Sequence, residues 1–536
     1  MKRLLTILLL LSIGLQATAK APRLVVQIVV GSMRAGDLER YADNFTEGGF
    51  KRLMEGGAYF TEGRYDYQQT TTPVSLATLT TGAMPSMHGV IGDYWFDYTD
   101  NSIVRLTAGR RGDGGYHLVA PTLAETLCHR GGYHLVAPTL AETLCHHNPA
   151  SKSVSLALEP TSAIVMGGRK GEIFWIEPTE AEWTTSLYYT NSMPEWIARS
   201  NREGYNLSYL LPDWRQILSK EQYHNTRHSD IRLVVGGKRQ ASTEPRRANP
   251  QNYGERLCFT PAGNSVVIGM AKQVIAQYGL GKDEHGDLLN IYFDSSRHIN
   301  QIYGPESIEV EDMYYRLDKE LEDFLTFLFA QVKEEECLVI LTSDHGTCSS
   351  YDLKEDQPAD RFNVQQFRVI VNGFLNVRYG TGNWVLGYRD QSIYLNHNLI
   401  YERNLRLDEV QNEVAIFAQQ FSGVSHALAA TALRTSYFGS GYARRIQNSF
   451  YPRRSGDVML NLQPGQIEER DLMRSSSGSM YGYDTQVPLI FFGNGLAARE
   501  IRREADMTSV APTVAYLLDI PEPEASEGAP LEELIR

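Results

Sequence analysis

The hydrophobic pattern along the chain alternates short, continuous apolar runs with longer stretches of helical periodicity. Three runs rich in β-branched and aromatic residues predict buried, mostly parallel strands: Leu24–Val30, Leu338–Thr342 and Pro488–Phe492. Between residues 309 and 332, apolar side chains recur every three or four positions with acidic residues opposite, which predicts a long amphipathic helix. This alternation indicates an α/β protein with a doubly wound, mostly parallel sheet flanked by helices.

Two stretches rich in Tyr, Asn and Arg interrupt the strand–helix rhythm, and we expect them to form an inserted cap. In folds of this class, such insertions leave the strand ends where binding sites are built. The predicted organisation is a signal peptide at 1–19, a core built from 20–184, 257–350 and 446–536, and cap insertions at 185–256 and 351–445.

The first nineteen residues resemble a secretory signal, which predicts a periplasmic protein. Lys2 and Arg3 precede the apolar run Leu4–Leu15, and Ala17–Ala19 forms a small-residue cleavage site. No later segment is apolar for long enough to predict a membrane span. The formal net charge is −13, which argues against nucleic acid as a main partner.

A sixteen-residue segment occurs twice without change, as Gly114–His129 and Gly131–His146. Each copy predicts a turn followed by a short helix that packs on a sheet. Two identical copies cannot fill one groove, so we expect one of them to bulge out as a surface loop or an extra helix. A recent tandem duplication explains the pattern better than a solenoid, which needs at least three repeats.

A threonine-rich segment carries the clearest candidate for chemistry. The pair Thr72–Pro73 predicts the start of a helix, with Thr72 as the N-cap and Pro73 as the first helical residue. The Thr72 hydroxyl would then lie beside free backbone N–H groups and the positive end of the helix dipole. This position suits a nucleophile that attacks phosphate, a group that binds an anion, or a simple helix cap.

Further motifs accompany Thr72 in a fixed order: Val25–Met33, Thr81–Gly92, Tyr303–Pro305, Thr342–Gly346, Asn383–Leu386, Ser392–His397, Arg454–Val458 and Tyr483–Pro488. Together they resemble the alkaline phosphatase superfamily, over nearly all of the chain after residue 19. The closest similarity is to its phosphate-irrepressible periplasmic branch, which is related to the nucleotide pyrophosphatase/phosphodiesterases. The resemblance implies a fold of the alkaline phosphatase type with an inserted cap, and a phosphate-ester hydrolase as ancestor.

The resemblance also implies a Ser or Thr nucleophile between two zinc ions, and Thr72 occupies that position. Of the six zinc-ligand positions, two keep a ligand residue, Asp344 and His345. The remaining four are replaced by Gly31, Arg297, Gln301 and Gln486, and a further His usual in the family is Ser477. Catalytic zinc normally takes three protein ligands, so these replacements predict that the zinc site is degenerate.

The residues that would bind the substrate phosphate are replaced as well. An Asn of the family becomes Asp93, and a Lys and an Arg become Glu159 and Thr161. Because carboxylates repel a phosphate, Asp93 and Glu159 disfavour phosphate-ester binding.

Arg297 brings a positive charge to a former ligand position, and several interpretations stay open. It would either pair with Asp344 as a structural ion pair, or form an anion-binding pocket with the Thr72 hydroxyl and the helix N-terminus. A third interpretation is a relocated metal site, because Asp294 and His298 keep the four-residue spacing three positions upstream.

We therefore expect an exported pseudophosphatase with a binding or scaffolding role and without a cofactor. Its partner would be another protein or a small anionic ligand. The alternative is an active phosphomonoesterase or phosphodiesterase that uses Thr72 as nucleophile at a relocated or single-metal zinc site.

Overall fold

The computed structural model describes residues 20–99, 101–107, 135–210, 214–227, 252–350, 361–468 and 473–535. The expected signal peptide at 1–19 and the first copy of the duplicated segment, 114–129, lie outside these residues. Among the helices within them, none combines the length and the apolar character that crossing a membrane requires.

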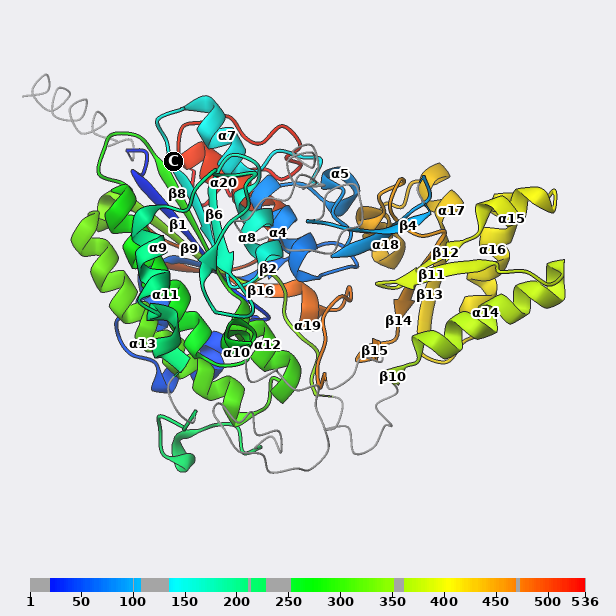
Figure 1. Ribbon diagram of the computed structural model, residues 1–536, viewed down its shortest axis with the longest axis horizontal. Helices are drawn as coiled ribbons and strands as arrows, with labels where there is room; N and C mark the ends of the chain where they lie inside the picture. The colour runs from blue at the N-terminus through cyan, green and yellow to red at the C-terminus, as the bar shows by residue number, and fades with distance from the viewer. Residues whose placement is uncertain are drawn as a thin grey trace, which may run out of the picture.

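A nine-stranded sheet forms the centre of the molecule, in the order β17-β2-β16-β9-β1-β8-β5-β6-β7 (Figure 1). Its strands are β1 Leu24–Val30, β2 Ala58–Arg64, β5 Ser153–Leu156, β6 Glu172–Ile176, β7 Trp183–Thr184, β8 Asp287–Phe293, β9 Cys337–Thr342, β16 Gln486–Gly493 and β17 Arg499–Asp506. The central strand β1 is parallel to both β8 and β9, whereas β16 is antiparallel to β9 and β2. The predicted doubly wound, mostly parallel α/β fold is confirmed, with one of the three predicted strands reversed.

Helices cover both faces of this sheet, because alternate side chains of β1 belong to two separate hydrophobic cores. One core includes α11 Ala262–Tyr278 and α13 Ile308–Gln331, the amphipathic helix that the sequence predicts. The other core includes α4 Thr72–Thr81, α8 Pro160–Gly167 and α20 Val510–Leu517. Figure 1 shows the two sets of helices on opposite sides of the strands.

The second copy of the duplicated segment forms α7, Leu140–His147, which is the short helix that the sequence predicts. A capping box begins it: Thr139 Oγ1 accepts from the backbone N–H of Glu142, and the Glu142 carboxylate accepts from the N–H of Thr139. Leu140 and Leu144 are buried in the same core as α4 and α8. This copy therefore packs into the core of the large domain, against α4, α8 and β5.

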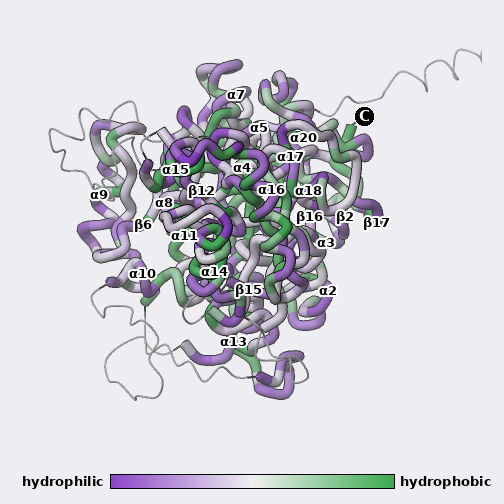
Figure 2. The backbone as a smooth tube through the Cα atoms, turned by 90° about the vertical axis from the view of Figure 1, so that its right-hand side faces the viewer, coloured by the Kyte–Doolittle hydropathy of each residue, from purple (hydrophilic) through white to green (hydrophobic). Residues whose placement is uncertain are grey.

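A smaller antiparallel sheet, in the order β11-β12-β14-β13, forms a second unit with its own hydrophobic core. It is built from β11 Val385–Arg389, β12 Ser392–Leu395, β13 Val424–Ala429, β14 Val458–Leu462, α14 Val364–Tyr379, α15 His397–Glu402 and α16 Leu407–Ala418. The unit extends beyond the expected boundary at 445, because β14 is the strand that joins β12 to β13. Figure 2 looks onto this unit, where hydrophilic and hydrophobic stretches alternate along the helices.

The described part of the first expected cap insertion packs elsewhere. It contains α9 Glu195–Arg202 and two short 3-10 helices, η2 Tyr205–Leu210 and η3 Lys220–Gln222. Helix η2 contacts α9 and α11, and Tyr223, directly after η3, donates to Asp312 of α13. Ile197 and Tyr223 of this stretch are buried in the core of α11 and α13. The stretch therefore packs onto the helical layer of the large domain and belongs to that domain.

The remaining elements are short. They are α2 Asp37–Tyr41, η1 Ala42–Asn44, α3 Phe50–Gly56, α5 Pro85–His88, β3 Tyr94–Asp97, β4 Ser102–Arg105, α10 Tyr253–Cys258, α12 Asp294–Tyr303, η4 Glu334–Glu336, β10 Arg361–Phe362, α17 Ala430–Thr435, α18 Gly441–Ser449, β15 Ile467–Glu468, α19 Gly482–Thr485 and η6 Met507–Ser509.

Candidate functional site

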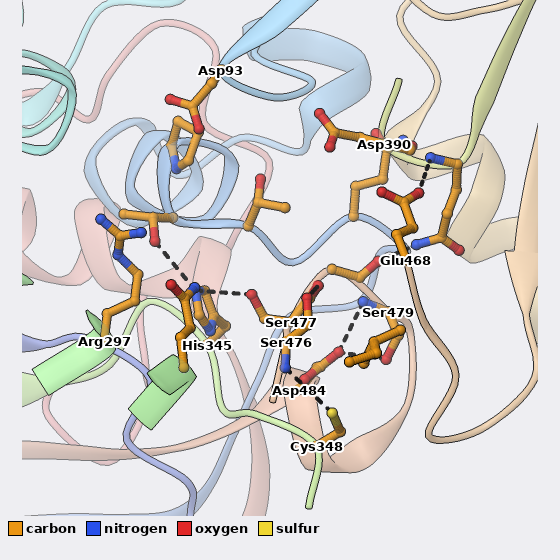
Figure 3. A pocket seen from close by; sticks show the side chains of 18 of the residues that line it. Asp93, Arg297, His345, Cys348, Asp390, Glu468, Ser476, Ser477, Ser479 and Asp484 are labelled. Atoms are coloured by element: carbon orange, nitrogen blue, oxygen red, sulfur yellow. Dashed lines mark hydrogen bonds between the residues drawn. The ribbon is translucent and has the colours of Figure 1, made fainter. Parts of the chain in front are cut away.

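A cleft of about 270 Å³ lies between the large sheet and the smaller unit. Thr72 at the start of α4, Arg297 on α12 and His345 after β9 line it from the large domain. Asp390 and Glu468 lie on the opposite side, and Figure 3 shows them facing Arg297 and His345 across the cavity. The described residues of 185–256 do not line this cleft.

Helix α4 begins at Thr72, one position earlier than the sequence predicts. Thr71 is the N-cap, and Thr72 is the first residue of the helix. Its side chain is therefore free of a capping role, and Thr72 Oγ1 donates to Oδ2 of Asp344 at 2.7 Å. The prediction that Thr72 caps the helix is wrong, but its hydroxyl does reach the two surviving ligand positions.

Asp344 is fully buried and its carboxylate is saturated with hydrogen bonds. Oδ1 accepts from the backbone N–H groups of Ser32 at 3.0 Å and His345 at 2.9 Å. Oδ2 accepts from the hydroxyls of Thr72 and Tyr292, both at 2.7 Å. Four donors therefore satisfy this carboxylate within the protein itself.

Tyr292, at the end of β8, fills the space beside Asp344. A Cβ atom added to Gly31 would lie 2.7 Å from the Tyr292 hydroxyl oxygen and 2.8 Å from Cβ of Arg297. An aspartate at position 31 would therefore clash with both side chains. Burial raises the pKa of Tyr292 well above its ordinary value, so its hydroxyl keeps its proton and acts as a donor.

His345 brings a ring nitrogen beside Thr72, which sequence proximity did not reveal. Its Nδ1 donates to the carbonyl of Gly346 at 2.6 Å, so in the neutral ring Nε2 is an acceptor. Burial lowers the pKa of His345, which favours this neutral form. Nε2 lies 3.2 Å from Thr72 Oγ1 and 3.3 Å from the hydroxyl of Ser477, which donates to it.

Arg297 pairs with Glu159, and this corrects the expected pairing with Asp344. The Arg297 guanidinium donates to Oε2 of Glu159, and His298 Nε2 lies 3.2 Å from Oε1 of the same carboxylate. Although burial opposes ionisation, Arg297 and His298 together hold the pKa of Glu159 well below its ordinary value. Two replaced positions of the family site, 159 and 297, thus neutralise each other.

The relocated pair of Asp294 and His298 is also engaged with the protein. Asp294 Oδ2 accepts from the backbone N–H groups of Leu158 at 2.6 Å and Glu159 at 3.1 Å, and Oδ1 accepts from Ser162 at 2.8 Å. Burial, followed by the nearby Glu159 carboxylate, raises the pKa of Asp294 to about 7. This carboxyl group holds the loop before α8 in place, and the Arg297 guanidinium lies beside both Asp294 and His298.

The other replaced positions supply no further metal ligand. Gln301, Ser477, Asp93 and Thr161 line the cleft, whereas Gln486 lies outside its lining. Among the described residues, no group of three or more His, Cys, Asp or Glu side chains is arranged to hold a metal ion. The residues present do not fit the two-zinc centre that the resemblance implies.

Comparisons with known proteins agree with this fold. The profile of the type I phosphodiesterase / nucleotide pyrophosphatase family matches residues 25–484. The chain is 28% identical over 531 residues to alkaline phosphatase PafA of Elizabethkingia meningoseptica, covering 98% of this chain and 96% of the relative. It is 26% identical to alkaline phosphatase PhoV of Synechococcus elongatus, covering 97% and 94%. The crystal structure of wild-type PafA superposes with a TM-score of 0.85 at 26% identity, covering 96% of this chain and 99% of that one.

Proposed function

The chain belongs to the type I phosphodiesterase / nucleotide pyrophosphatase family of the alkaline phosphatase superfamily, and from this premise we propose that it is a pseudophosphatase. In this proposal the protein is exported through the signal sequence at 1–19 and works in the periplasm. It binds a ligand in the cleft that the smaller unit covers, and it needs no metal cofactor.

One observation carries the proposal: the Tyr292 hydroxyl donates to Asp344 at 2.7 Å and lies 2.7 Å from the Cβ that any larger residue at Gly31 would add. A carboxylate held by four internal donors has little left to offer a cation. At position 31 the loss of a ligand is thus accompanied by Tyr292 and Arg297 side chains that fill the space.

The charge around Thr72 supports the same conclusion. Phosphoryl transfer depends on positive groups that stabilise charge on the transferred phosphoryl oxygens. Here the guanidinium of Arg297 is bound to Glu159, and Asp93 adds a carboxylate to the wall of the cleft. These two carboxylates weaken the positive electrostatic support that a phosphate ester requires.

A second candidate function is an active phosphatase or phosphodiesterase with Thr72 as nucleophile. The names of the relatives, alkaline phosphatases PafA and PhoV, favour it. The position of His345 Nε2, 3.2 Å from Thr72 Oγ1, also favours it, because an adjacent base can activate a hydroxyl. It would require a single-metal or relocated zinc site, or catalysis by the protein's own groups.

Hydrolysis assays separate the two candidates. The purified protein and its Thr72→Ala variant are assayed with p-nitrophenyl phosphate and bis-p-nitrophenyl phosphate, with zinc added or chelated, beside an active alkaline phosphatase. The pseudophosphatase predicts a background rate that zinc leaves unchanged and that is equal in both proteins. Turnover that zinc stimulates and Thr72→Ala abolishes would establish the enzyme instead.

A further inference from the structure

We propose that the surface formed by α17, α18 and the loop between them binds an acidic segment of a partner protein. We call it the arginine–tyrosine surface, and it consists of Arg434, Tyr437, Tyr442, Arg444 and Arg453. None of these residues lines the cleft, so the inference goes beyond the proposed function and does not depend on it.

The sequence around this surface is unusual for so acidic a chain. Between residues 414 and 456 there is no Asp, Glu or Lys, whereas five arginines occur: Arg434, Arg444, Arg445, Arg453 and Arg454. The whole chain, by contrast, has a formal net charge of −13. Positive charge is thus gathered in one stretch, and it attracts groups of the opposite sign.

A single carboxylate compensates part of this charge. Among the described residues, Asp66 is the one acidic residue that forms ion pairs with these arginines, at 3.7 Å from Arg444 and 3.0 Å from Arg445. Two guanidinium groups share this carboxylate, so an excess of positive charge remains even here.

Arg434 and Arg453 carry the rest of the excess. Both side chains are exposed, and neither forms an ion pair with any residue that the structure describes. Arg434 donates to the neutral backbone carbonyl of Pro452 at 2.9 Å, which brings its guanidinium next to the residue that precedes Arg453. Arginines that lie this close together can each bind a carboxylate of one acidic segment through paired hydrogen bonds.

Two exposed aromatic rings complete the surface. Tyr437 is 89% exposed and Tyr442 is 44% exposed, and the Tyr442 ring stacks on His426 with 3.7 Å between the ring centres. Tyrosine and arginine are enriched in the contact areas between proteins and provide much of the binding energy there, whereas lysine is depleted. Arginine and tyrosine without lysine therefore favour a protein as the partner.

Hydrogen bonds fix the loop that carries Tyr437. Gln447 Nε2 donates to the carbonyl of Ser436 at 2.7 Å, and Gln447 Oε1 accepts from the N–H of Phe438 at 3.2 Å. Arg444 donates to the carbonyl of Gly439 at 3.2 Å. Because the loop is already held in place, a partner loses less free energy in ordering it on binding.

The charge of the rest of the chain argues against an extended polyanion, such as a membrane surface or a nucleic acid. An extended partner would also face the acidic remainder of the protein and would be repelled by it. A short acidic segment contacts the arginine–tyrosine surface alone. The charge and the composition of the surface thus favour the same class of partner.

Fluorescence anisotropy with a matched pair of labelled peptides tests this inference. One peptide consists of Glu-Leu-Glu-Gly repeats, and in the other each glutamate is replaced by glutamine. We expect the acidic peptide to bind, with an affinity that falls as salt is added, and we expect the glutamine peptide not to bind. Equal binding of the two peptides, or no binding of the acidic peptide at low salt, would overturn the inference.

Variants locate the binding on the arginine–tyrosine surface. Arg434→Gln and Arg453→Gln should each weaken binding of the acidic peptide about fivefold, the effect of one exposed charge contact. Tyr437→Ser removes an exposed ring and should weaken it by about the same factor. Arg403→Gln is the matched control, because Arg403 is exposed, belongs to the smaller unit and donates to a backbone carbonyl as Arg434 does. This control should bind as the wild type does.

Vesicles of phosphatidylglycerol test the membrane as an alternative partner. Cosedimentation that the Arg434→Gln/Arg453→Gln variant loses, without binding of the acidic peptide, would assign the surface to a membrane and overturn the inference. Equal weakening by Arg403→Gln would show attraction to positive charge in general and would overturn it as well. None of these results bears on Thr72-dependent hydrolysis, which tests the proposed function separately.

Discussion

The hydroxyl of Tyr292 lies 2.7 Å from Oδ2 of Asp344, and the Thr72 hydroxyl lies at the same distance from the same oxygen. Side chains from the end of β8 and from the start of α4 thus donate hydrogen bonds to the same buried carboxylate. In the family to which the chain belongs, the resemblance places a zinc ion beside the residue at position 344. The arrangement found here ties Asp344 into the protein interior instead.

The first prediction concerns the stability that this arrangement provides. Tyr292→Phe removes one donor from the buried Asp344 carboxylate, so we expect the free energy of unfolding to fall by about 1–3 kcal/mol. Urea unfolding followed by circular dichroism measures the change. Tyr437→Phe, at a tyrosine that is 89% exposed, is the matched control and should be neutral. A Tyr292→Phe protein as stable as this control would contradict the assigned role.

A second prediction tests the space at position 31. Gly31→Ala places Cβ 2.7 Å from the Tyr292 hydroxyl, so we expect a loss of about 1–3 kcal/mol from overpacking. At Gly373, in the middle of α14, an added Cβ meets nothing within 4 Å. Gly373→Ala should therefore stabilise the protein by about 0.5–1 kcal/mol through helix propensity. The opposite signs of these changes make thermal unfolding of both variants a direct comparison.

The contact between Arg297 and Glu159 yields a third prediction. Glu159→Ala leaves the Arg297 guanidinium without its partner. Because 37% of the Glu159 side chain is exposed, we expect a loss of about 2 kcal/mol, less than at a fully buried pair. The double variant Glu159→Leu/Arg297→Met should recover part of that stability, since the guanidinium that lost Glu159 is removed as well. Losses in the double variant that equal the sum of the single losses would show that the pair does not interact.

A fourth prediction concerns His88 and the decrease in folding stability at acidic pH. Burial, helped by the charge of Arg454, lowers the pKa of His88 to about 3. The neutral ring accepts from Val90 N–H at Nδ1, and Nε2 lies 3.1 Å from Thr78 Oγ1. The folded state thus resists protonation more than the unfolded state, so stability is complete above about pH 6.5 and declines below it, by up to about 1.4 kcal/mol per pH unit.

Urea unfolding at pH 7 and pH 5.5 measures this dependence. In His88→Asn the neutral side chain cannot titrate, so the decline between the two pH values should be smaller than in the wild type. An identical decline in both proteins would assign the acid sensitivity to other groups.

The sequence predicted the main strands and helices of the fold. It did not predict the side chains that contact Asp344 and Arg297. Leu24–Val30 is recovered residue for residue as β1, and the helix between 309 and 332 is recovered as α13, because both patterns reflect simple burial. Tyr292 gave no signal, since a tyrosine within a buried strand is typical of any core. Its contact with Asp344, 52 positions along the chain, depends on how β8 and β9 flank β1.

The partner of Arg297 was missed for a similar reason. Glu159 and Arg297 are 138 positions apart, and the sequence alone favoured Asp344 because both belonged to the implied metal site. The one-residue shift of the α4 cap, from Thr72 to Thr71, is the usual uncertainty at a helix end. Small as it is, this shift decides whether the Thr72 hydroxyl caps a helix or reaches Asp344.

The most direct test of the account is the zinc content of the purified protein after incubation with excess zinc and removal of unbound metal, measured by mass spectrometry. The account predicts no stoichiometric zinc, and the same result for the Thr72→Ala and His345→Ala variants. One or two zinc ions per chain, lost when Asp344 or His345 is replaced, would contradict it.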